Sequence, residues 1–263
     1  NYDFLVNFLK THKVDTVIHC AAYKHVNILE NNLQQAIQNN TIGTYNLCKA
    51  SLENNADFLL ISTDKAVEPT SVLGYSKRAA ENVTRYFSAK NSKKIVNIVR
   101  FGNVIGSSGS AIPNFLNQIN NDLPITITHK KASRYFMSIN QACYLVLKTF
   151  DLKIRNKVFF LEMGKPIFIY DLVKKLINLK KRILPNYSPI IKMSGLQKGE
   201  KLKEVLYFRN KKNKTQNKMI YYLNEKEINS VKIEYFLKKI LLGINTLSNK
   251  SLKNFLIKIS GLN

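Results

Sequence analysis

The stretch FLLISTDK, residues 58–65, decides the fold. Its first six residues form a short apolar run typical of a buried strand, and an acid and a base follow it directly. In open α/β folds, ligands bind outside the carboxyl ends of the parallel strands, so Thr63, Asp64 and Lys65 are predicted at a ligand site. A strand-ending turn, with Asp64 capping the next element and Lys65 in solvent, is the structural alternative.

The flanking segments repeat this alternation of strand and helix. Residues 14–22 (VDTVIHCAA) and 95–100 (IVNIVR) are predicted as buried strands, and residues 31–54 and 72–89 as the helices between the strands. The first half of the chain therefore predicts an α/β fold with half of a doubly wound parallel sheet. The three strands should lie parallel and adjacent, so that their carboxyl ends share one cleft.

The second half predicts smaller, mixed elements. They are a helix at 112–119, a strand at 125–128, a helix around 142–147, a strand at 158–161 and a helix near 170–179. From residue 228, apolar residues recur at helical spacing among lysines. That pattern predicts an amphipathic helix packed on the body of the protein, with a helix lying on a membrane surface as the alternative.

The net charge is +24, from 41 basic and 17 acidic residues. A positive field favours nucleic acid, an anionic membrane surface or an anionic small substrate, and solvated lysines are the neutral explanation. The basic residues form no dense arm before the C-terminal third, and the pattern of an RNA-binding module is absent, so no nucleic-acid partner is expected. The three cysteines have no metal-binding spacing, which predicts a reducing compartment and no metal site.

Two motifs are expected beside the acid and base that follow the strand at 58–63. Lys77 stands in the first turns of the predicted helix at 72–89, where a lysine can point into the same cleft. The segment GNVIGSSGS, residues 102–110, follows the strand at 95–100, and its small residues leave backbone amides free to approach an anion or a sugar.

Seven segments in series resemble those of the CapD-like polysaccharide-biosynthesis 4,6-dehydratases, which act on UDP-N-acetylglucosamine and belong to the extended short-chain dehydrogenase/reductase superfamily. They are AAYKHV (21–26), NTIGT (40–44), STDKA (62–66), GYSKR (74–78), RFGNVIGSSGS (100–110), RYFM (134–137) and GEKL (199–202), the last followed by Glu204. The resemblance implies an NAD-binding Rossmann fold with a smaller mixed α/β region that binds the substrate.

The resemblance also implies the reaction of a hydro-lyase in capsule or O-antigen biosynthesis. NAD⁺ takes hydride from C4 of a UDP-N-acetylhexosamine, with UDP-N-acetylglucosamine the expected substrate, water is lost across C5 and C6, and the hydride returns to C6. Asp64 and Lys65 take the paired roles of acid for the C6 hydroxyl and base at C5. Thr63 is expected to hydrogen-bond the C4 oxygen, and Lys77 to bind the nicotinamide ribose and favour alkoxide at C4.

Further site residues follow from the same resemblance. Ala21, Ala22 and Lys24 are expected to border the cofactor, and Asn103, Arg134 and Glu200 the UDP-sugar. The superfamily usually carries a tyrosine four residues before the lysine, whereas Leu73 stands there and Tyr75 is out of register.

No G-x-G-x-x-G occurs in the sequence, and the family's first two βα units have no counterpart before residue 14. We therefore expect weak NAD⁺ binding by this chain alone and, as partner, either a homo-oligomer or a separate Gly-rich N-terminal half. No apolar stretch approaches the ~18 residues of a membrane span and no signal peptide is evident. The expected location is the cytoplasm, with membrane association only through upstream residues.

The expected organisation has three parts: residues 1–110, a partial Rossmann NAD-binding domain; 111–227, mostly the substrate-binding region with some elements returning to the Rossmann part; and 228–263, an amphipathic helical segment. Two other functions stay open. A UDP-hexosamine 4-epimerase is disfavoured by Asp64-Lys65 and Leu73. A catalytically silent remnant that binds a nucleotide-sugar is the other alternative.

Overall fold

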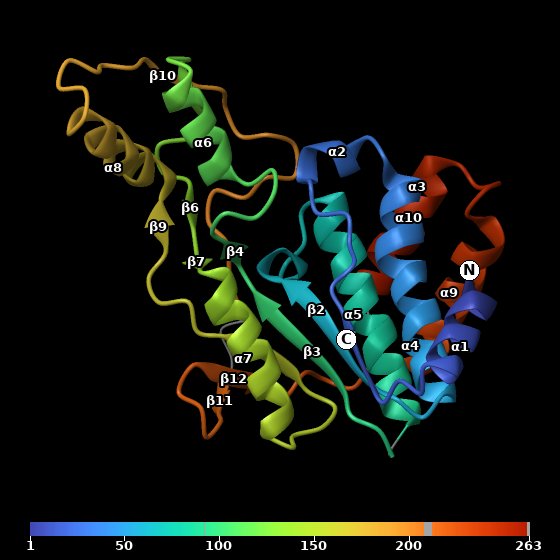
Figure 1. The fold of residues 1–263 in the computed structure, drawn as a ribbon. Coiled ribbons are helices and arrows are strands. Elements are labelled where there is room, and N and C mark those ends of the chain that lie inside the picture. The colour runs from blue at the N-terminus through green and yellow to red at the C-terminus, as the bar shows by residue number, and fades with distance from the viewer. Residues whose placement is uncertain (92, 208–211, 262–263) are drawn as a thin grey trace.

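The computed structural model describes residues 1–91, 93–207 and 212–261. Its centre is a sheet of order β1-β2-β3-β8-β12-β11 (Figure 1). The strands are β1 (Thr16–His19), β2 (Asp57–Thr63), β3 (Val96–Phe101), β8 (Val158–Leu161), β12 (Ile220–Leu223) and β11 (Lys212–Lys214). The first four are parallel and the last two antiparallel, so the predicted α/β fold with three adjacent parallel strands is confirmed.

Alternate residues of the central strands face two different helical layers. Phe58 and Leu60 of β2 pack with Cys48 of α4 (Gly43–Glu53) and Ala80 of α5 (Val72–Lys90). Leu59 packs on the opposite face with Leu145 of α7 (Ile139–Asp151). Figure 1 shows α5 and α7 on the two sides of β2 and β3. Because both faces are covered, these strands read as continuous apolar runs in the sequence.

The first strand is shorter and more exposed than predicted. The sequence predicts a buried strand over residues 14–22, whereas β1 spans Thr16–His19 and leaves both Thr16 and Ile18 exposed. It pairs with β2 on one side only and stands at the edge of the sheet. A run of apolar residues looks the same at an edge and in the middle of a sheet, which is why the pattern alone predicts burial.

The helix predicted over residues 31–54 is interrupted. After α1 (Tyr2–Thr11) and β1, the chain forms α2 (Val26–Glu30), α3 (Leu33–Ala36), a π-helical turn (η1, Ile37–Ile42) and then α4. Within the π-turn, buried Asn40 donates to the Tyr23 carbonyl and accepts from the Tyr23 amide, at 3.0 and 2.8 Å. Such turns recur at functional sites, and this one fixes the segment that follows β1.

A smaller lobe stands beyond the carboxyl ends of the strands, at the upper left of Figure 1. Helices α6 (Ala111–Asn120) and α8 (Ile169–Lys181) pack there on β5 (Ile125–Ile127), which pairs with β10 (Ile191–Met193). Two further short pairs join the lobe to the body: β4 (Asn103–Val104) with β7 (Phe136–Met137), and β6 (Ser133–Arg134) with β9 (Ile167–Phe168).

The C-terminal residues form two helices where the sequence predicts one amphipathic segment. Helices α9 (Ser230–Gly243) and α10 (Asn249–Ser260) bury Ile233, Leu237 and Leu256 in one core with Val83 of α5. The predicted packing on the body is therefore the one found. In the part of the chain that the structure describes, no helix combines the length and the hydropathy needed to cross a membrane.

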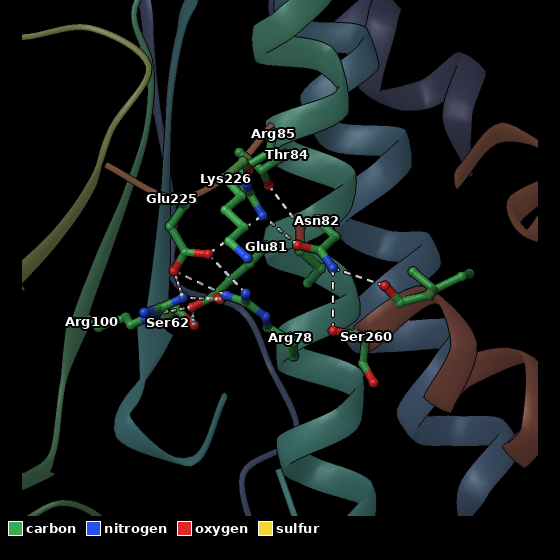
Figure 2. A network of polar contacts seen from close by, with 12 residues as sticks. Ser62, Arg78, Glu81, Asn82, Thr84, Arg85, Arg100, Glu225, Lys226 and Ser260 are labelled. Carbon is green, nitrogen blue, oxygen red and sulfur yellow. Dashed lines mark hydrogen bonds and ion pairs between the residues drawn. The ribbon is translucent and has the colours of Figure 1, made fainter. Parts of the chain in front are cut away.

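A buried network of charged side chains ties α5 to the sheet (Figure 2). Glu81 of α5 accepts two hydrogen bonds from Arg100 of β3, both at 2.7 Å, and one from Arg78 at 2.9 Å. Ser62 of β2 donates to the same carboxylate at 2.7 Å. Glu225, just after β12, binds Arg100 and Arg78 from the other side. The network lies one turn beyond Lys77 on α5 and directly beside Thr63 on β2, so it anchors the two elements that carry the predicted site.

The first turn of α5 approaches the 3₁₀ turn at Asp64–Ala66 (η2) very closely. A Cβ at Gly74 would lie 2.6 Å from the Lys65 carbonyl oxygen, whereas at Gly43 the nearest atom would lie 3.6 Å away. We therefore expect Gly74→Ala to lower the free energy of unfolding by about 1–3 kcal/mol in urea denaturation. Gly43→Ala is the matched control, because a helical glycine with room should gain up to about 1 kcal/mol from the substitution. Equal stability of Gly74→Ala and the wild type would show that the two segments separate freely.

Candidate active site

A cleft of about 630 Å³ lies between the carboxyl ends of β1, β2 and β3 and the smaller lobe. Most of the residues predicted at the site line it: Ala22, Lys24, Thr63, Lys65, Lys77, Asn103, Arg134 and Glu200. The structure thus brings together side chains from six of the seven motif segments. Ala21 and Asp64 do not line the cleft.

Asp64 is fully buried, whereas the sequence predicts it to open on the cleft. The turn η2 begins at Asp64 and rotates its carboxylate under the cleft wall, where a Cβ on Gly102 would lie 3.1 Å from Oδ2. Both Thr63 Oγ1 and Lys65 Nζ donate to Asp64 Oδ1, at 2.8 and 3.0 Å. Since Thr63 and Lys65 line the cleft, Asp64 acts on it through these two groups.

Lys65 stands among carboxylates. Its Nζ lies 3.0 Å from Asp64 Oδ1 and 3.6 Å from Glu204 Oε1, and about a fifth of its side chain is exposed. Burial favours the neutral amine, but the two carboxylates outweigh it and raise the pKa of Lys65 above its ordinary value. Lys65 is therefore an ammonium ion in the ligand-free protein, and it must lose that proton before it can act as a base.

Lys77 has the opposite environment. Its Nζ donates to the Ile61 carbonyl at 2.7 Å, and burial lowers its pKa to about 8, with Glu81 and Cys20 opposing the shift. Lys77 is charged at neutral pH and becomes neutral as the pH rises through about 8. Leu73 lines the cleft beside it, whereas Tyr75 packs into the core with α9 and α10. Leu73 thus faces the cleft and Tyr75 does not, while the assignment of Leu73 to the tyrosine position stays a prediction.

Arg134 and Glu200 form an ion pair across the substrate side of the cleft. Arg134 Nη2 donates to Glu200 Oε1 at 2.7 Å, and Nη1 donates to the Ser133 carbonyl at 2.8 Å. Thr128 also donates to Glu200. Arg134 is buried and most of its fork is engaged by the protein, which leaves less of the guanidinium for a diphosphate than the sequence suggests.

The residues on the sheet side fit the nicotinamide end of a dinucleotide. Lys77 offers a cation, Asn103 has a buried Oδ1 that receives no hydrogen bond from the described residues, and Asn40 holds the segment at residues 20–25 along the cleft. Gly109 packs so tightly on His25 that a Cβ would lie 2.5 Å from the imidazole ring. A turn for the pyrophosphate is not part of this sequence.

Two residues with evident roles at the cleft are missed by sequence reasoning. Asn40 and Glu204 both fall in segments quoted for the family resemblance, yet neither receives a role there. Asn40 acts on backbone 17 residues away, and Glu204 acts on Lys65 from a distant part of the chain. Neither residue has a local signal in the sequence, because Asn40 stands among other polar residues and Glu204 among lysines.

Residues 1–225 match the family described as "Polysaccharide biosynthesis protein". The capsular polysaccharide biosynthesis protein CapD of Staphylococcus aureus is 44% identical over 207 residues, which are 78% of this chain and 34% of CapD. A UDP-N-acetylglucosamine 4,6-dehydratase (inverting) of Campylobacter jejuni is 33% identical over 73% of this chain and 56% of its own length. A UDP-glucose 4-epimerase of Rickettsia felis is 36% identical over 56% of this chain and 44% of its own length.

Solved structures agree on the fold. The structure of Pen from Bacillus thuringiensis has a TM-score of 0.72 and 34% identity, covering 79% of this chain and 65% of Pen. The dTDP-glucose 4,6-dehydratase DesIV from Streptomyces venezuelae, solved with NAD bound, has a TM-score of 0.70 at 18% identity, over 79% of this chain and 68% of DesIV. The chain spans 34% to 56% of the length of the three curated relatives described above.

Proposed function

The chain belongs to the polysaccharide biosynthesis protein family, and from that premise we propose that it carries the acid–base machinery of a nucleotide-sugar 4,6-dehydratase. The observation that carries the proposal is the Asp64–Lys65 pair, 3.0 Å apart at the end of β2, on a cleft shared with Lys77 and Asn103. Elimination of water from a 4-keto sugar needs a base at C5 and an acid at the C6 oxygen, and this pair supplies one of each.

The proton transfers proposed for Asp64 and Lys65 balance over the elimination. When the Lys65 ammonium passes its proton to Asp64 Oδ1 along their hydrogen bond, the amine becomes a base and the carboxyl becomes an acid. Lys65 then accepts the C5 proton. Asp64 sends its proton through the Thr63 hydroxyl, which bonds Oδ1 and lines the cleft, to the C6 hydroxyl, which departs as water. The elimination thereby restores the original ion pair.

A bound NAD⁺ would supply the hydride chemistry of the reaction at C4 and C6 of the sugar. The residues that would hold its nicotinamide ribose are Lys77, with Ala22 and Lys24 bordering it. The Lys77 charge favours alkoxide at C4 below about pH 8, because the ammonium is lost above that pH. Support for this cofactor comes from the fit of these residues and from the NAD seen in DesIV.

The proposed substrate is a UDP-N-acetylhexosamine, and UDP-N-acetylglucosamine first. Support comes from the name of the Campylobacter jejuni relative and from the net charge of +24, which attracts an anionic nucleotide-sugar. Asn103, Arg134 and Glu200 are the residues proposed to border it.

A 4-epimerase is the second candidate, favoured by the Rickettsia felis relative. Leu73 argues against it, because the tyrosine that such epimerases usually carry is replaced there by an aliphatic side chain that cannot move a proton. The test is to incubate the complete natural protein with UDP-N-acetylglucosamine in deuterated water and identify the product by NMR. A 4-keto-6-deoxy sugar deuterated at C5 supports the dehydratase. Formation of UDP-N-acetylgalactosamine would instead support the epimerase. No conversion of either kind would favour a silent nucleotide-sugar-binding remnant.

We predict weak binding of NAD⁺ to the isolated 263-residue chain. A pyrophosphate is normally held by the backbone amides of a Gly-rich turn at a helix N-terminus, and no G-x-G-x-x-G stands in this sequence. Calorimetric titration should show no saturation up to about 1 mM NAD⁺. Adding a separately produced Gly-rich half from a relative should restore NAD⁺ binding, because that half can pair with β1 at the edge of this chain's sheet. Saturation at micromolar NAD⁺ by the chain alone would contradict this prediction.

A further inference from the structure

Glu204 is a buried carboxylate at the site that the proposed chemistry does not use. Its side chain is 3% exposed, and Oε1 lies 3.6 Å from Lys65 Nζ. No described residue donates a hydrogen bond to Oε2, which lies 3.9 Å from Lys201 Nζ. A bridge between Ser133 and Lys203 fixes the backbone next to it. Burial of a carboxylate with an oxygen that receives no hydrogen bond costs folding free energy. A contribution of Glu204 to the function of the site would account for such a cost.

We propose that Glu204 is a positioning residue that sets the charge of Lys65, holding it as an ammonium ion together with Asp64. The role of Lys65 in elimination rests on the proposed function, whereas its charge in the free protein does not. Of the described residues, only Asp64 and Glu204 form ion pairs with Lys65.

Asp64 is the nearer carboxylate and has the larger effect on Lys65, and Glu204 adds to it. The positive charges of Arg134 and Lys201 both favour the neutral form of Lys65. The carboxylates near Lys201 are Glu204, Asp64 and Glu68. Asp64 shares its Oδ1 with the Thr63 hydroxyl. Removing the negative charge of Glu204 leaves Lys65 with one carboxylate against two cations, so its pKa should fall.

The geometry has a consequence for the order of events. Burial raises the pKa of Glu204 above its ordinary value, and the charges of Lys65 and Arg134 oppose that shift. While Glu204 carries its charge, Lys65 is a poor base, and a ligand that entered the cleft and contacted Glu204 would release it. The resting site is therefore held in a protonated state that protects the lysine from premature reaction with electrophiles. In the Glu204→Gln variant this protection should be lost.

The test measures the amine itself and needs neither cofactor nor turnover. Brief labelling with acetic anhydride between pH 6 and 11, followed by peptide mass spectrometry, gives the neutral fraction of Lys65 relative to Lys198, whose side chain is 75% exposed. In Glu204→Gln the midpoint should move about one pH unit lower, so that Lys65 labelling near pH 8 rises about tenfold. Glu204→Asp should retain most of the wild-type profile.

Glu234→Gln is the matched control, because Glu234 lies on α9 in exposed ion pairs with Lys90 and Lys238 and forms none with Lys65 among the described residues. Its Lys65 midpoint should equal that of the wild type. A loosened structure would raise labelling at every pH without moving the midpoint. An unchanged midpoint in Glu204→Gln, or an equal shift in Glu234→Gln, overturns the proposal. Failure of the dehydration assay would instead overturn the proposed function and leave this result standing.

Discussion

Lys65→Ala in the complete enzyme should lower formation of the 4-keto-6-deoxy product by roughly 10²–10⁴-fold, the loss typical of a missing general base. The Lys65 amine lies on the cleft at the carboxyl end of β2. Through its hydrogen bond to Asp64 the ammonium can pass its proton to the carboxylate and so become a base. Alanine removes the base but leaves the first hydride transfer possible. Because Asp64 and Glu204 lose their cation in this variant, its stability is measured by urea denaturation alongside the rate.

Exchange at C5 separates the steps of this reaction. In deuterated water, Lys65→Ala should lose both the exchange of the C5 hydrogen and the dehydrated product, measured by NMR of the sugar. Lys49→Ala is the control, since Lys49 sits on α4 in an exposed pair with Glu53 and should leave the rate unchanged. Wild-type dehydration by Lys65→Ala would place the base elsewhere, even if the family assignment holds.

Asp64→Asn is expected to slow departure of the C6 hydroxyl while preserving the shape of the buried turn. An amide cannot carry the proton that Asp64 is proposed to pass through Thr63. Exchange at C5 should therefore survive better than product formation, and the ratio of the two rates is the measurement. Equal loss of both would assign Asp64 to the positioning of Lys65 rather than to acid catalysis.

The sequence predicts the strands and helices of the first half closely, because each is a local pattern. The run at residues 58–63 becomes β2 within one residue, and the helix predicted at 72–89 is α5. The cleft follows from topology, since carboxyl ends of adjacent parallel strands share one edge. Local apolar patterns also predict the helical C-terminus, whereas the break between α9 and α10 directly after Gly243 is not part of the prediction.

What could not be predicted depends on contacts between distant parts of the chain. Glu204 reaches Lys65 because its segment forms a bridge with β6 at Ser133. Glu225 reaches Arg100 because it follows β12, a strand of the central sheet. A glutamate among lysines has the same local pattern whether it is solvated or buried. The burial of Asp64 likewise depends on the turn η2 and on the close approach of Gly102, neither of which has a periodicity to detect.

Glu81→Ala should lower the free energy of unfolding by about 3–5 kcal/mol, the usual cost of leaving buried charge without its partner. Glu81 accepts four hydrogen bonds: two from Arg100, one from Arg78 and one from Ser62 (Figure 2). Both arginines are almost completely buried. Without Glu81, both arginines keep their pairs with Glu225 but lose a fully buried counter-charge that water cannot readily replace. Urea denaturation followed by circular dichroism measures the loss.

The pH dependence of stability tests independently whether the charge of Glu81 is what stabilises the fold. Glu81→Gln serves for this experiment if the alanine variant does not fold. The arginines lower the pKa of Glu81 below its ordinary 4.5. A carboxyl with a lowered pKa contributes stability that is fully present above about pH 4.5 and is lost as the pH falls through its folded value. The stability gap between wild type and Glu81→Gln should therefore close in acid. Asp151→Ala, which breaks an exposed pair with Lys148, should leave the midpoint unchanged at neutral pH. A gap that persists below the folded pKa would mean that shape, rather than charge, is what Glu81 contributes between α5 and β3.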